Sequence, residues 1–360
     1  MIIIAGTSAP GGISQVIKGY ARDGVFEKWD VRWIKTHVAG GILHRVLAAL
    51  YGLCSVIFWM ACGRVQLVHT HAAMRGSFWR KSILVFAARI LGVPVVVHLH
   101  GSEMKVFYSS SNRFARWCVR SALERADRVV VLSAGWAEYV KVIAPAAKVS
   151  VIANYSPAIP LAHNAHGIEK KNNKFIFLFL GALIDRKGIY ELLPAFAKLS
   201  SEFPDTELWL GGSGEMEKVQ AVVDQNPLAA VRLLGWVDDI TKNQLLMAAD
   251  AFVLPSKNEN LPLSIIEAMS ASLPIISTRI GGIPEMLTDG EEALLIAPGH
   301  VDPLYEALRK IRTDPAGADL ISRNALKRYA AEFSPEIGLP KIDALYAQFS
   351  KKNISHRSKV

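Results

Sequence analysis

The sequence predicts an α/β protein made of two doubly wound domains, each a parallel sheet with helices on both faces. First, short apolar segments alternate with helical patterns along most of the chain, which is typical of parallel strands joined by helices. Second, residues 156–174, rich in Pro, Asn and Lys, interrupt this alternation once and lack apolar periodicity. Third, a length of 360 residues is enough for two hydrophobic cores. We therefore expect an N-terminal domain over residues 1–158, a linker over 159–174 and a C-terminal domain over 175–335.

The composition is that of a globular protein of a reducing compartment. Hydrophobic residues make up 51% of the chain and charged residues 20%. Cys54, Cys62 and Cys118 lie in apolar or helical stretches without C-x-x-C spacing or a companion His cluster, which indicates neither a disulfide framework nor a zinc site. The start, MIIIAGTSAPGG, has no basic region and is expected to be a first strand rather than a signal peptide. These features predict a cytoplasmic protein.

The positive charge is concentrated in the first half. Residues 1–170 hold 20 Lys or Arg against 8 Asp or Glu, whereas residues 171–360 hold 21 against 24. A positive half is suited to nucleic acid, an anionic membrane or a phosphorylated acceptor. The cations are scattered, with no stacking platform or recognisable nucleic-acid motif, so we expect no nucleic-acid partner.

The elements of the first half follow from apolar runs bounded by turn residues. We expect strands at residues 2–5, 31–34, 66–68, 93–99 and 128–132. Gly11 and Gly12 come after the first strand and before a helical pattern, where they would let a ligand approach the helix start closely. As a phosphate signal this pair is weak, and a plain strand-to-helix turn explains it equally well.

The most apolar run of the chain is residues 46–63, bounded by Arg45 and Arg64. Its length of 18 reaches the lower limit of a membrane span. Strands are expected on both sides of it, however, and one domain cannot have its sheet on both sides of a bilayer. We therefore favour a helix packed in the domain or lying on a membrane surface.

Two further features of the first half are candidates for function. The stretch RGSFWRKS places Arg75, Trp79, Arg80 and Lys81 at a helix start, which fits an acceptor-facing or membrane-facing surface and equally a solvated helix face. His100 directly follows the buried strand at 93–99, at the carboxyl end where open α/β sheets bind ligands.

In the second half, the polar motifs all follow strands. We expect strands at residues 175–180, 207–211, 231–234, 251–254 and 274–277 and helices at 190–202, from 215, at 241–248 and at 262–270. GALIDRKG, GGSGE, GWVDD, the loop at 255–260 and GGIPE each lie at or shortly after the carboxyl end of one of these strands. Because carboxyl ends of parallel strands share one edge, these loops are expected to line one ligand cleft.

Glu259 and Glu267 stand eight positions apart in PSKNENLPLSIIEAM. Glu259 is expected on the loop and Glu267 in the first turns of a helix that opens near Pro262, because Pro suits a first helical turn. A helix start binds phosphate, and ionised carboxylates accept hydrogen bonds from sugar hydroxyls. The stretch thus suits a nucleotide sugar. A general acid/base pair, or two ordinary surface residues, would give the same spacing.

These motifs resemble the family 4 retaining glycosyltransferases, which have the GT-B architecture of two Rossmann-like domains facing a cleft. The resemblance rests on the Glu-x7-Glu pattern, GALIDRKG, FVLPS, PIISTRIGGIPEML and the early glycine pair, and covers nearly the whole chain. It implies that Glu259 holds the donor sugar, Glu267 the ribose and Lys187 the phosphates. It further implies that His100 reaches the donor from the N-terminal domain. A C-terminal helix at about 336–352 would complete that domain.

The resemblance defines an expected site and one departure from the family. The usual pattern has Arg where this sequence has Ala182, and Arg186 is expected to supply that charge. His100, Arg186, Lys187 and Glu259 form the expected catalytic set. The expected donor-binding set is Gly11, Gly12, Gly212, Val237, Asn260, Leu261, Pro262, Leu263 and Glu267.

The implied reaction is transfer of a sugar from a UDP- or GDP-sugar with retention at the anomeric carbon. The sequence has no D-x-D triplet, so we expect activity without a metal and without a cofactor. The apolar run and the basic first half suggest a polyprenyl-diphosphate-linked acceptor of bacterial surface or exopolysaccharide synthesis, on the inner face of the plasma membrane. A soluble acceptor, a nucleotide-sugar epimerase of the same architecture, and a non-enzymatic basic nucleic-acid- or membrane-binding protein are the alternatives.

Overall fold

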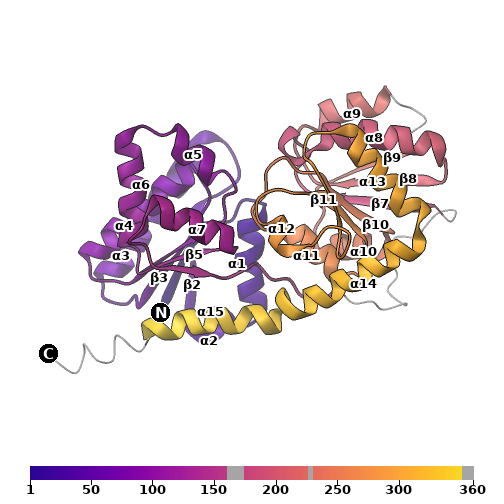
Figure 1. Cartoon of the computed structure of the whole chain (residues 1–360). Coiled ribbons are helices and arrows are strands. Elements are labelled where there is room, and N and C mark those ends of the chain that lie inside the picture. Colours follow the sequence, from indigo (N-terminus) through magenta and orange to yellow (C-terminus); the bar gives the residue numbers. More distant parts are fainter. Residues whose placement is uncertain (160–173, 226–229, 351–360) are drawn as a thin grey trace. The chain divides into compact units, whose positions relative to one another are not determined.

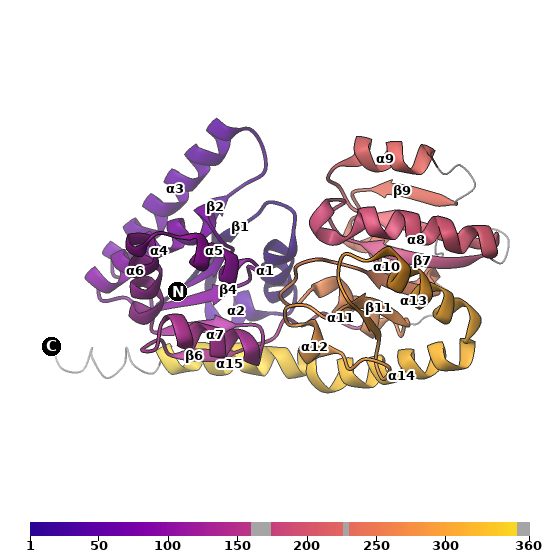
Figure 2. The same ribbon diagram turned by 45° about the horizontal axis from the view of Figure 1, so that its top comes forward.

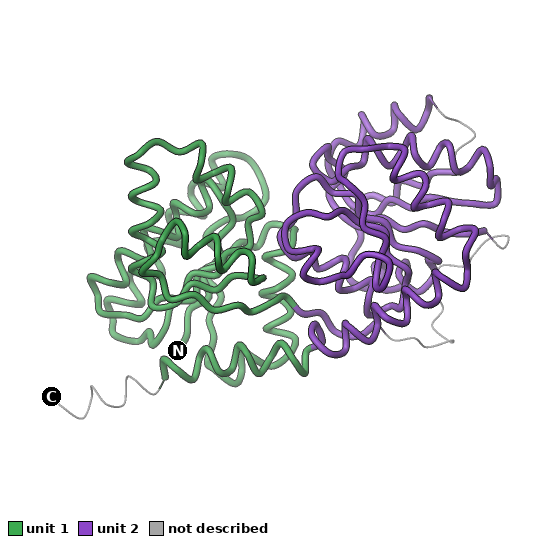
Figure 3. Tube along the Cα trace, viewed as in Figure 1, with its two compact units in different colours: residues 1–154, 335–360 green, residues 155–334 purple. Residues whose placement is uncertain are grey.

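The computed structural model describes residues 1–159, 174–225 and 230–350, which form two compact units. Unit 1 comprises Met1–Asn154 with Pro335–Val360, and unit 2 comprises Tyr155–Ser334 (Figure 3). Each unit is a parallel six-stranded sheet with flanking helices, which confirms the predicted fold class. Apart from Ile159 and Lys174, the predicted linker at 159–174 lies outside the described residues.

Unit 1 is built on a sheet with the strand order β2-β1-β3-β4-β5-β6. Its strands are β1 (Ile2–Thr7), β2 (Val31–His37), β3 (Leu67–Ala72), β4 (Val95–Leu99), β5 (Arg128–Val131) and β6 (Val149–Val151). Its helices are α1 (Gly12–Arg22), α2 (Val25–Trp29), α3 (Ile42–Ala61), α4 (Gly76–Ile90), α5 (Met104–Ser110), α6 (Arg113–Arg125), α7 (Ala134–Ile143) and α15 (Pro335–Ser350). The central strands β3 and β4 are buried along their whole length, as parallel strands covered on both faces must be.

The helix α15 comes from the far end of the chain and packs on unit 1. Asp343 accepts hydrogen bonds from the indole Nε1 of Trp29 at 2.6 Å and from Nζ of Lys28 at 2.7 Å. Deeper in the unit, the hydroxyl of Tyr346 lies 2.8 Å from Nδ1 of His69 on β3. The last helix is thus part of the core of the first unit, alongside α2 (Figure 1).

Unit 2 has the strand order β12-β11-β10-β7-β8-β9. Its strands are β7 (Phe175–Leu180), β8 (Thr206–Gly211), β9 (Val231–Gly235), β10 (Ala251–Leu254), β11 (Ile275–Thr278) and β12 (Leu294–Ile296). Its helices are the short 3-10 helix η1 (Asp185–Lys187), α8 (Ile189–Glu202), α9 (Met216–Asp224), α10 (Asp239–Ala248), α11 (Leu263–Ser270), α12 (Ile283–Met286), α13 (Val301–Thr313) and α14 (Pro315–Glu332). The order reverses between β7 and β10, so the chain leaves these neighbouring strands towards opposite sides of the sheet, which is where doubly wound sheets bind ligands.

The strand at 66–68 was predicted too short. β3 runs to Ala72 and includes His69, Thr70 and His71, all of which are buried. The sequence carries no strand signal here because HTH is polar, and the burial of these residues depends on neighbours that are distant in sequence. The three-residue strands β6 and β12 were not predicted at all.

The apolar run at 46–63 forms most of α3. It is the one helix of the described residues that is long and apolar enough to cross a membrane, with a mean hydropathy of 1.7 and only 11% of its apolar window buried. The strands before and after it, β2 and β3, belong to the same sheet. The helix therefore lies on the periphery of unit 1, as Figure 2 shows, rather than separating two parts of the unit.

Candidate functional site

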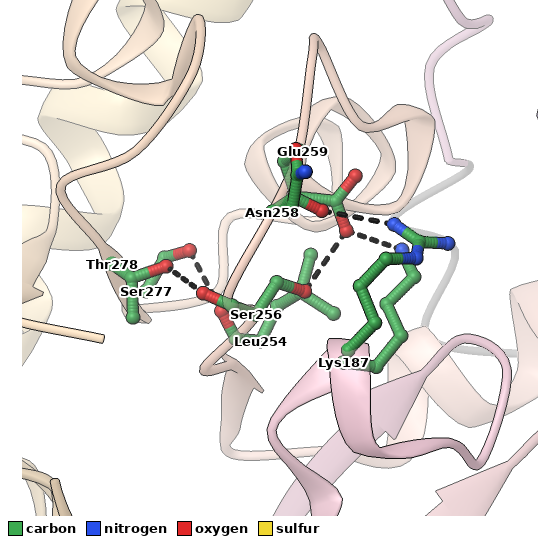
Figure 4. A network of polar contacts seen from close by, with 8 residues as sticks. Lys187, Leu254, Ser256, Asn258, Glu259, Ser277 and Thr278 are labelled. Atoms are coloured by element: carbon green, nitrogen blue, oxygen red, sulfur yellow. Dashed lines mark hydrogen bonds and ion pairs between the residues drawn. The ribbon is translucent and has the colours of Figure 1, made fainter. Parts of the chain in front are cut away.

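Two loops meet at the point where the order of the second sheet reverses. The loop after β7 carries Lys187 and the loop after β10 carries Glu259, and the Lys187 ammonium is paired with Oε1 of Glu259 (Figure 4). The Ser256 hydroxyl donates to the same carboxylate oxygen at 2.9 Å. The two paired side chains are only 14% and 9% exposed. A buried carboxylate and a largely buried ammonium thus form an ion pair beside the sheet edge.

Glycine at position 188 brings these two loops into direct backbone contact. Gly188 has φ of 73°, and a Cβ there would overlap the carbonyl oxygen of Pro255. Next to it, the Lys257 amide donates to the Arg186 carbonyl at 2.8 Å. The Arg186 guanidinium in turn donates to the Asn258 carbonyl at 2.9 Å. Arg186 therefore fixes the loop that presents Glu259, in addition to the charge that it brings.

The GGIPE turn supports the Glu259 loop from its other side. Gly281 has φ of 55°, and a Cβ there would overlap the Glu259 carbonyl oxygen. The Gly282 amide donates to the Asn260 carbonyl at 2.8 Å, and the Thr278 hydroxyl donates to the Ser256 carbonyl at 2.6 Å. Figure 4 shows Thr278 and Lys187 approaching the loop from opposite sides. Side-chain and backbone contacts together hold Glu259 in one position.

The second glutamate is paired with a lysine that sequence reasoning missed. Glu267 is buried in the second turn of α11, and its Oε1 lies 2.6 Å from Nζ of Lys242 on α10. Lys242 also pairs with Asp239 at 3.1 Å. Burial lowers the pKa of Lys242, but the charge of Glu267 and its hydrogen bond more than offset this, and the pKa is raised. The signal available in the sequence was the position of Lys242 in the helix that follows the GWVDD loop.

The other predicted donor-binding residues of unit 2 lie on the same loops. Pro262 caps α11 with an extended backbone, and Leu263 begins the helix. Asn260 and Leu261 are buried between Glu259 and this helix start. Gly212 follows β8, and Val237 follows β9. A Cβ on Gly212 would overlap the Gly181 carbonyl oxygen, so the loops after β7 and β8 are also in backbone contact.

The predicted glycine pair of unit 1 begins α1. Gly11 takes φ of 147°, and neither Gly11 nor Gly12 has an atom within 4 Å of the place where a Cβ would lie. Within the described chain, no side chain caps this helix start. Gly11 and Gly12 are exposed, and an uncapped helix start is the arrangement that a helix uses to bind an anion.

His100 belongs to a row of histidines that the sequence did not reveal. His69 and His71 on β3 and His98 on β4 are buried and offer ligand atoms within 4.8 Å of one another, a set that could hold a metal ion. Nδ1 of His71 lies 2.9 Å from Nε2 of His100. Burial lowers the pKa of His69 and of His100 to about 3, so the row is neutral at pH 7.

The stretch RGSFWRKS does not form one basic surface, which corrects one part of the prediction. Arg75 is exposed, whereas Trp79 and Arg80 are half-buried and Trp79 packs against Phe107. Lys81 is buried and donates to the hydroxyl of Thr36, and burial lowers its pKa to about 7. The reason is helical periodicity, because Lys81 lies on the face of α4 that packs against the sheet.

The arrangement in unit 2 is suited to a ligand that carries both phosphates and hydroxyls. Lys187, Arg186 and the amides at the start of α11 can bind phosphate oxygens. The carboxylates of Glu259 and Glu267 can accept hydrogen bonds from hydroxyls on either side of the phosphates. The two glutamates do not divide into a general acid and a general base, because each carboxylate is paired with a lysine.

Two family models match the chain. Residues 9–155 match a glycosyl transferase 4-like domain, and residues 163–333 match the glycosyl transferases group 1. Together the two models cover most of both structural units.

The chain is similar to several proteins whose names differ in the sugar or the acceptor. Over 309 residues the chain is 30% identical to the UDP-Gal:alpha-D-GlcNAc-diphosphoundecaprenol alpha-1,3-galactosyltransferase of Escherichia coli, covering 79% of this chain and 75% of the relative. It is 29% identical to glycogen synthase of Mycobacterium tuberculosis, over 68% of this chain and 61% of that protein. It is 23% identical to alpha-D-kanosaminyltransferase of Streptomyces kanamyceticus, with 81% of each covered.

Solved structures share the fold over nearly the whole chain. Sucrose-phosphate synthase from Thermosynechococcus elongatus superposes with a TM-score of 0.79 at 21% identity, covering 98% of this chain and all of that one. Anabaena HepE in complex with UDP superposes with a TM-score of 0.73 at 20% identity, covering 96% and 99%. The two doubly wound units are thus those of a known two-domain architecture.

Proposed function

The chain belongs to the family 4 glycosyltransferases with the GT-B fold, and on this premise we propose that it transfers a sugar, with retention, from a nucleotide-diphosphate sugar to a lipid-linked glycan. The observation that carries the donor assignment is the Lys187 pair with Glu259 beside the start of α11, at the reversal point of the second sheet. This is a phosphate-binding environment with a hydroxyl acceptor built into it. UDP- or GDP-sugars are the proposed donors.

Each end of the donor has a proposed partner in unit 2. The diphosphate is bound by Lys187, Arg186 and the amides of the α11 start. When Lys187 turns to a phosphate oxygen, the carboxylate of Glu259 becomes available to the sugar hydroxyls. Glu267, whose carboxylate pairs with Lys242 at 2.6 Å, accepts from the ribose. The Gly11 and Gly12 amides and His100 are the proposed contributions of unit 1.

The chemistry follows from where charge develops. As the bond between the anomeric carbon and the diphosphate breaks, the sugar becomes oxocarbenium-like and negative charge accumulates on the leaving phosphate. Cations and amides fixed before the reaction stabilise that charge more in the transition state than in the bound donor. Backbone hydrogen bonds hold the loop that carries Lys187 and Arg186, and the Arg186 guanidinium is itself held by the Asn258 carbonyl.

We propose that these cations replace a metal ion. Support comes from the sequence, which has no D-x-D triplet, and from the clustering of Lys187 and Arg186 at one loop. Turnover should persist in a chelator such as EDTA. Strict dependence on an added divalent ion would reject this part of the proposal.

The proposed acceptor is a polyprenyl-diphosphate-linked intermediate of bacterial surface or exopolysaccharide synthesis. The E. coli relative is named for a diphosphoundecaprenol acceptor, and the basic charge of this chain lies in its first half. The enzyme would then work at the cytoplasmic face of the plasma membrane. Transfer to a short-chain polyprenyl-diphosphate glycan tests this, and exclusive transfer to a soluble sugar would reject it.

A ligand screen tests the donor assignment directly. Thermal unfolding should be measured with UDP-, GDP- and ADP-sugars, followed by anomeric analysis of the product by NMR. We expect one nucleotide sugar to stabilise the protein. We also expect the product to have the same axial bond at its anomeric carbon as the donor. Conversion of the donor to an epimer without an acceptor would favour the epimerase alternative instead.

A further inference from the structure

The surface formed by α3 and the edge strand β2 has no role in the donor site. The helix packs on β2 through Gly52, where a Cβ would overlap the Lys35 carbonyl oxygen, and through the buried side chains of Val56 and Met60. This close approach attaches one face of α3 firmly to the sheet. The opposite face of the helix points away from the sheet.

That opposite face is apolar and exposed. The exposed fraction rises from 49% for Val46 to 74% for Ile42 and Tyr51. The large apolar residues of this face are Ile42, Leu43, Val46, Leu47, Leu50, Tyr51 and Phe58. Soluble monomers rarely expose so many large apolar side chains together, and such patches mark contact surfaces.

A groove with basic side chains lies between the helix and the strand. Its volume is about 550 Å³, and its lining includes Arg32, Lys35 and Trp59. The Arg32 guanidinium lies 4.5 Å above the Trp59 ring. Arg32 and Lys35 are exposed and form no ion pair with the described residues, so both charges remain available to an anion.

Between β2 and β4 the chain has no negative charge to balance them, and Asp30, just before β2, pairs with the amino terminus of Met1. Residues 31–102, which contain β2, α3, β3, α4 and β4, hold eight Lys or Arg and no Asp or Glu. An apolar helix face bordered by unpaired cations is complementary to a bilayer with an anionic surface.

We propose that α3 lies in the interface of an anionic bilayer and that the groove between β2 and α3 binds the phosphate of an anionic lipid headgroup. The face of Ile42 to Phe58 enters the boundary between headgroups and acyl chains, while Arg32 and Lys35 contact the phosphate. The proposal assigns a surface to the membrane-side location given above. It rests on the proposed function for the reason why the enzyme binds a membrane, and not for the binding itself. Its test needs no sugar donor.

Two other occupants fit the surface less well. A second copy of the chain would bring the same unbalanced cations to the interface, and like charges would oppose association. A membrane span is excluded by the position of β2 and β3 in one sheet. Of these three occupants, the anionic bilayer is the one that matches both the apolar face and the charge.

The test is vesicle flotation of the full chain, without nucleotide sugar. Vesicles of phosphatidylcholine alone are compared with vesicles that also contain phosphatidylglycerol. The unchanged chain should bind the anionic vesicles at least about tenfold more tightly, since each cation near such a surface contributes about 1 kcal/mol. Equal binding to both vesicles, or to neither, would overturn the proposal.

Two variants separate the apolar and the charged contributions. A Leu47→Ser, Leu50→Ser double variant should lose most binding to anionic vesicles, and an Arg32→Gln, Lys35→Gln double variant should weaken it about tenfold or more. The matched controls are Leu320→Ser in unit 2 and Lys141→Gln with Lys148→Gln in unit 1, all at exposed positions, which should bind like the unchanged chain. Loss of binding in the controls, or none in the two variants, would refute the assigned surface.

Three accompanying measurements distinguish membrane binding from misfolding, from dimer formation and from binding of a free anion. Thermal unfolding with and without the donor nucleotide should be the same for the α3 variants and the unchanged chain, which shows that they fold and that donor binding is a separate property. Sedimentation should show no dimer that the Leu47→Ser, Leu50→Ser variant abolishes. If inorganic phosphate binds in the groove but vesicles do not, the site is for a free anion and the lipid proposal is wrong.

Discussion

Lys187 and Glu259 are 72 residues apart in the sequence, and their ammonium and carboxylate are paired across the neighbouring strands β7 and β10. Both groups are largely removed from water, so each depends on the other for a counter-charge. The pair can open for a ligand that offers a phosphate to one group and hydroxyls to the other. This exchange of partners is the basis of the first two predictions.

Replacing Lys187 by Met should lower kcat/KM by about 10²–10³-fold, because one positive group is lost where the leaving phosphate gains charge. The control is Lys198→Met, which removes an amine paired with Asp302 on the exposed surface of unit 2. That variant should keep its activity. Steady-state kinetics decide, and unchanged turnover in the Lys187→Met enzyme would show that the lysine does not act on the phosphates.

Substitutions of the two glutamates should differ in how they affect binding of the free nucleotide and of the whole donor. Glu259→Gln is expected to weaken binding of the whole nucleotide sugar while leaving the free nucleotide diphosphate almost unaffected, since its carboxylate is assigned to the sugar. Glu267→Gln should weaken binding of both ligands by a similar factor, about 10- to 100-fold, since a hydrogen bond to a charged group contributes about 1.5–3 kcal/mol. Calorimetric titration with the two ligands gives the comparison. Equal losses in both variants would contradict the assignment of separate ends.

Gly281 is predicted to be required for donor binding, and not only for the stability of the turn that contains it. A Gly281→Ala side chain would overlap the Glu259 carbonyl oxygen, so the loop that presents Glu259 must move. Gly290→Ala is the matched control, because φ is also positive there, at 78°, but the added Cβ meets no atom within 4 Å. Gly290→Ala should lose about 1 kcal/mol of stability from the positive φ alone, and Gly281→Ala should lose more because of the overlap. Only Gly281→Ala should also lose donor binding in a thermal-shift titration.

The sequence predicted those parts of the site that depend on local order along the chain. Glu259, Lys187 and the start of α11 follow from the rule that loops after parallel strands share an edge. The pairing of Lys242 with Glu267 was not predictable in this way, because it depends on how α10 and α11 pack.

The errors in unit 1 have the same physical origin. The histidine row needs the register of β3 and β4, in which His71 lies opposite His98, and this register is a property of the assembled sheet. Lys81 was taken for a surface cation because its neighbours in sequence are polar or basic. Its actual neighbour is Thr36 on β2, and only the packing of α4 on the sheet reveals that.

The histidine row predicts a loss of stability in acid. Burial lowers the pKa of His69 to about 3, from a usual value of 6.5. Between these values the unfolded chain holds the proton and the folded chain does not, so the free energy of unfolding falls as the pH is lowered from 6.5 to 3. His98 contributes in the same direction, and neither of its ring nitrogens has a hydrogen-bond partner among the described residues. In urea titrations, His98→Leu should make this fall shallower by up to about 1.4 kcal/mol per pH unit. An unchanged slope would show that His98 does not titrate with unfolding.

The buried Lys81 predicts how the free energy of unfolding changes above pH 7. Burial lowers its pKa to about 7 from a usual value of 10.5, so between these values the unfolded chain holds a proton that the folded chain has released. The free energy of unfolding should therefore rise with pH over this window, by at most about 1.4 kcal/mol per pH unit. Lys81→Met should remove the rise and stabilise the protein below pH 7, because no ammonium is then buried. Thr36→Val, which removes the hydroxyl partner but keeps the amine, should retain the rise. A Lys81→Met protein whose stability still increases above pH 7 would locate the titrating group elsewhere.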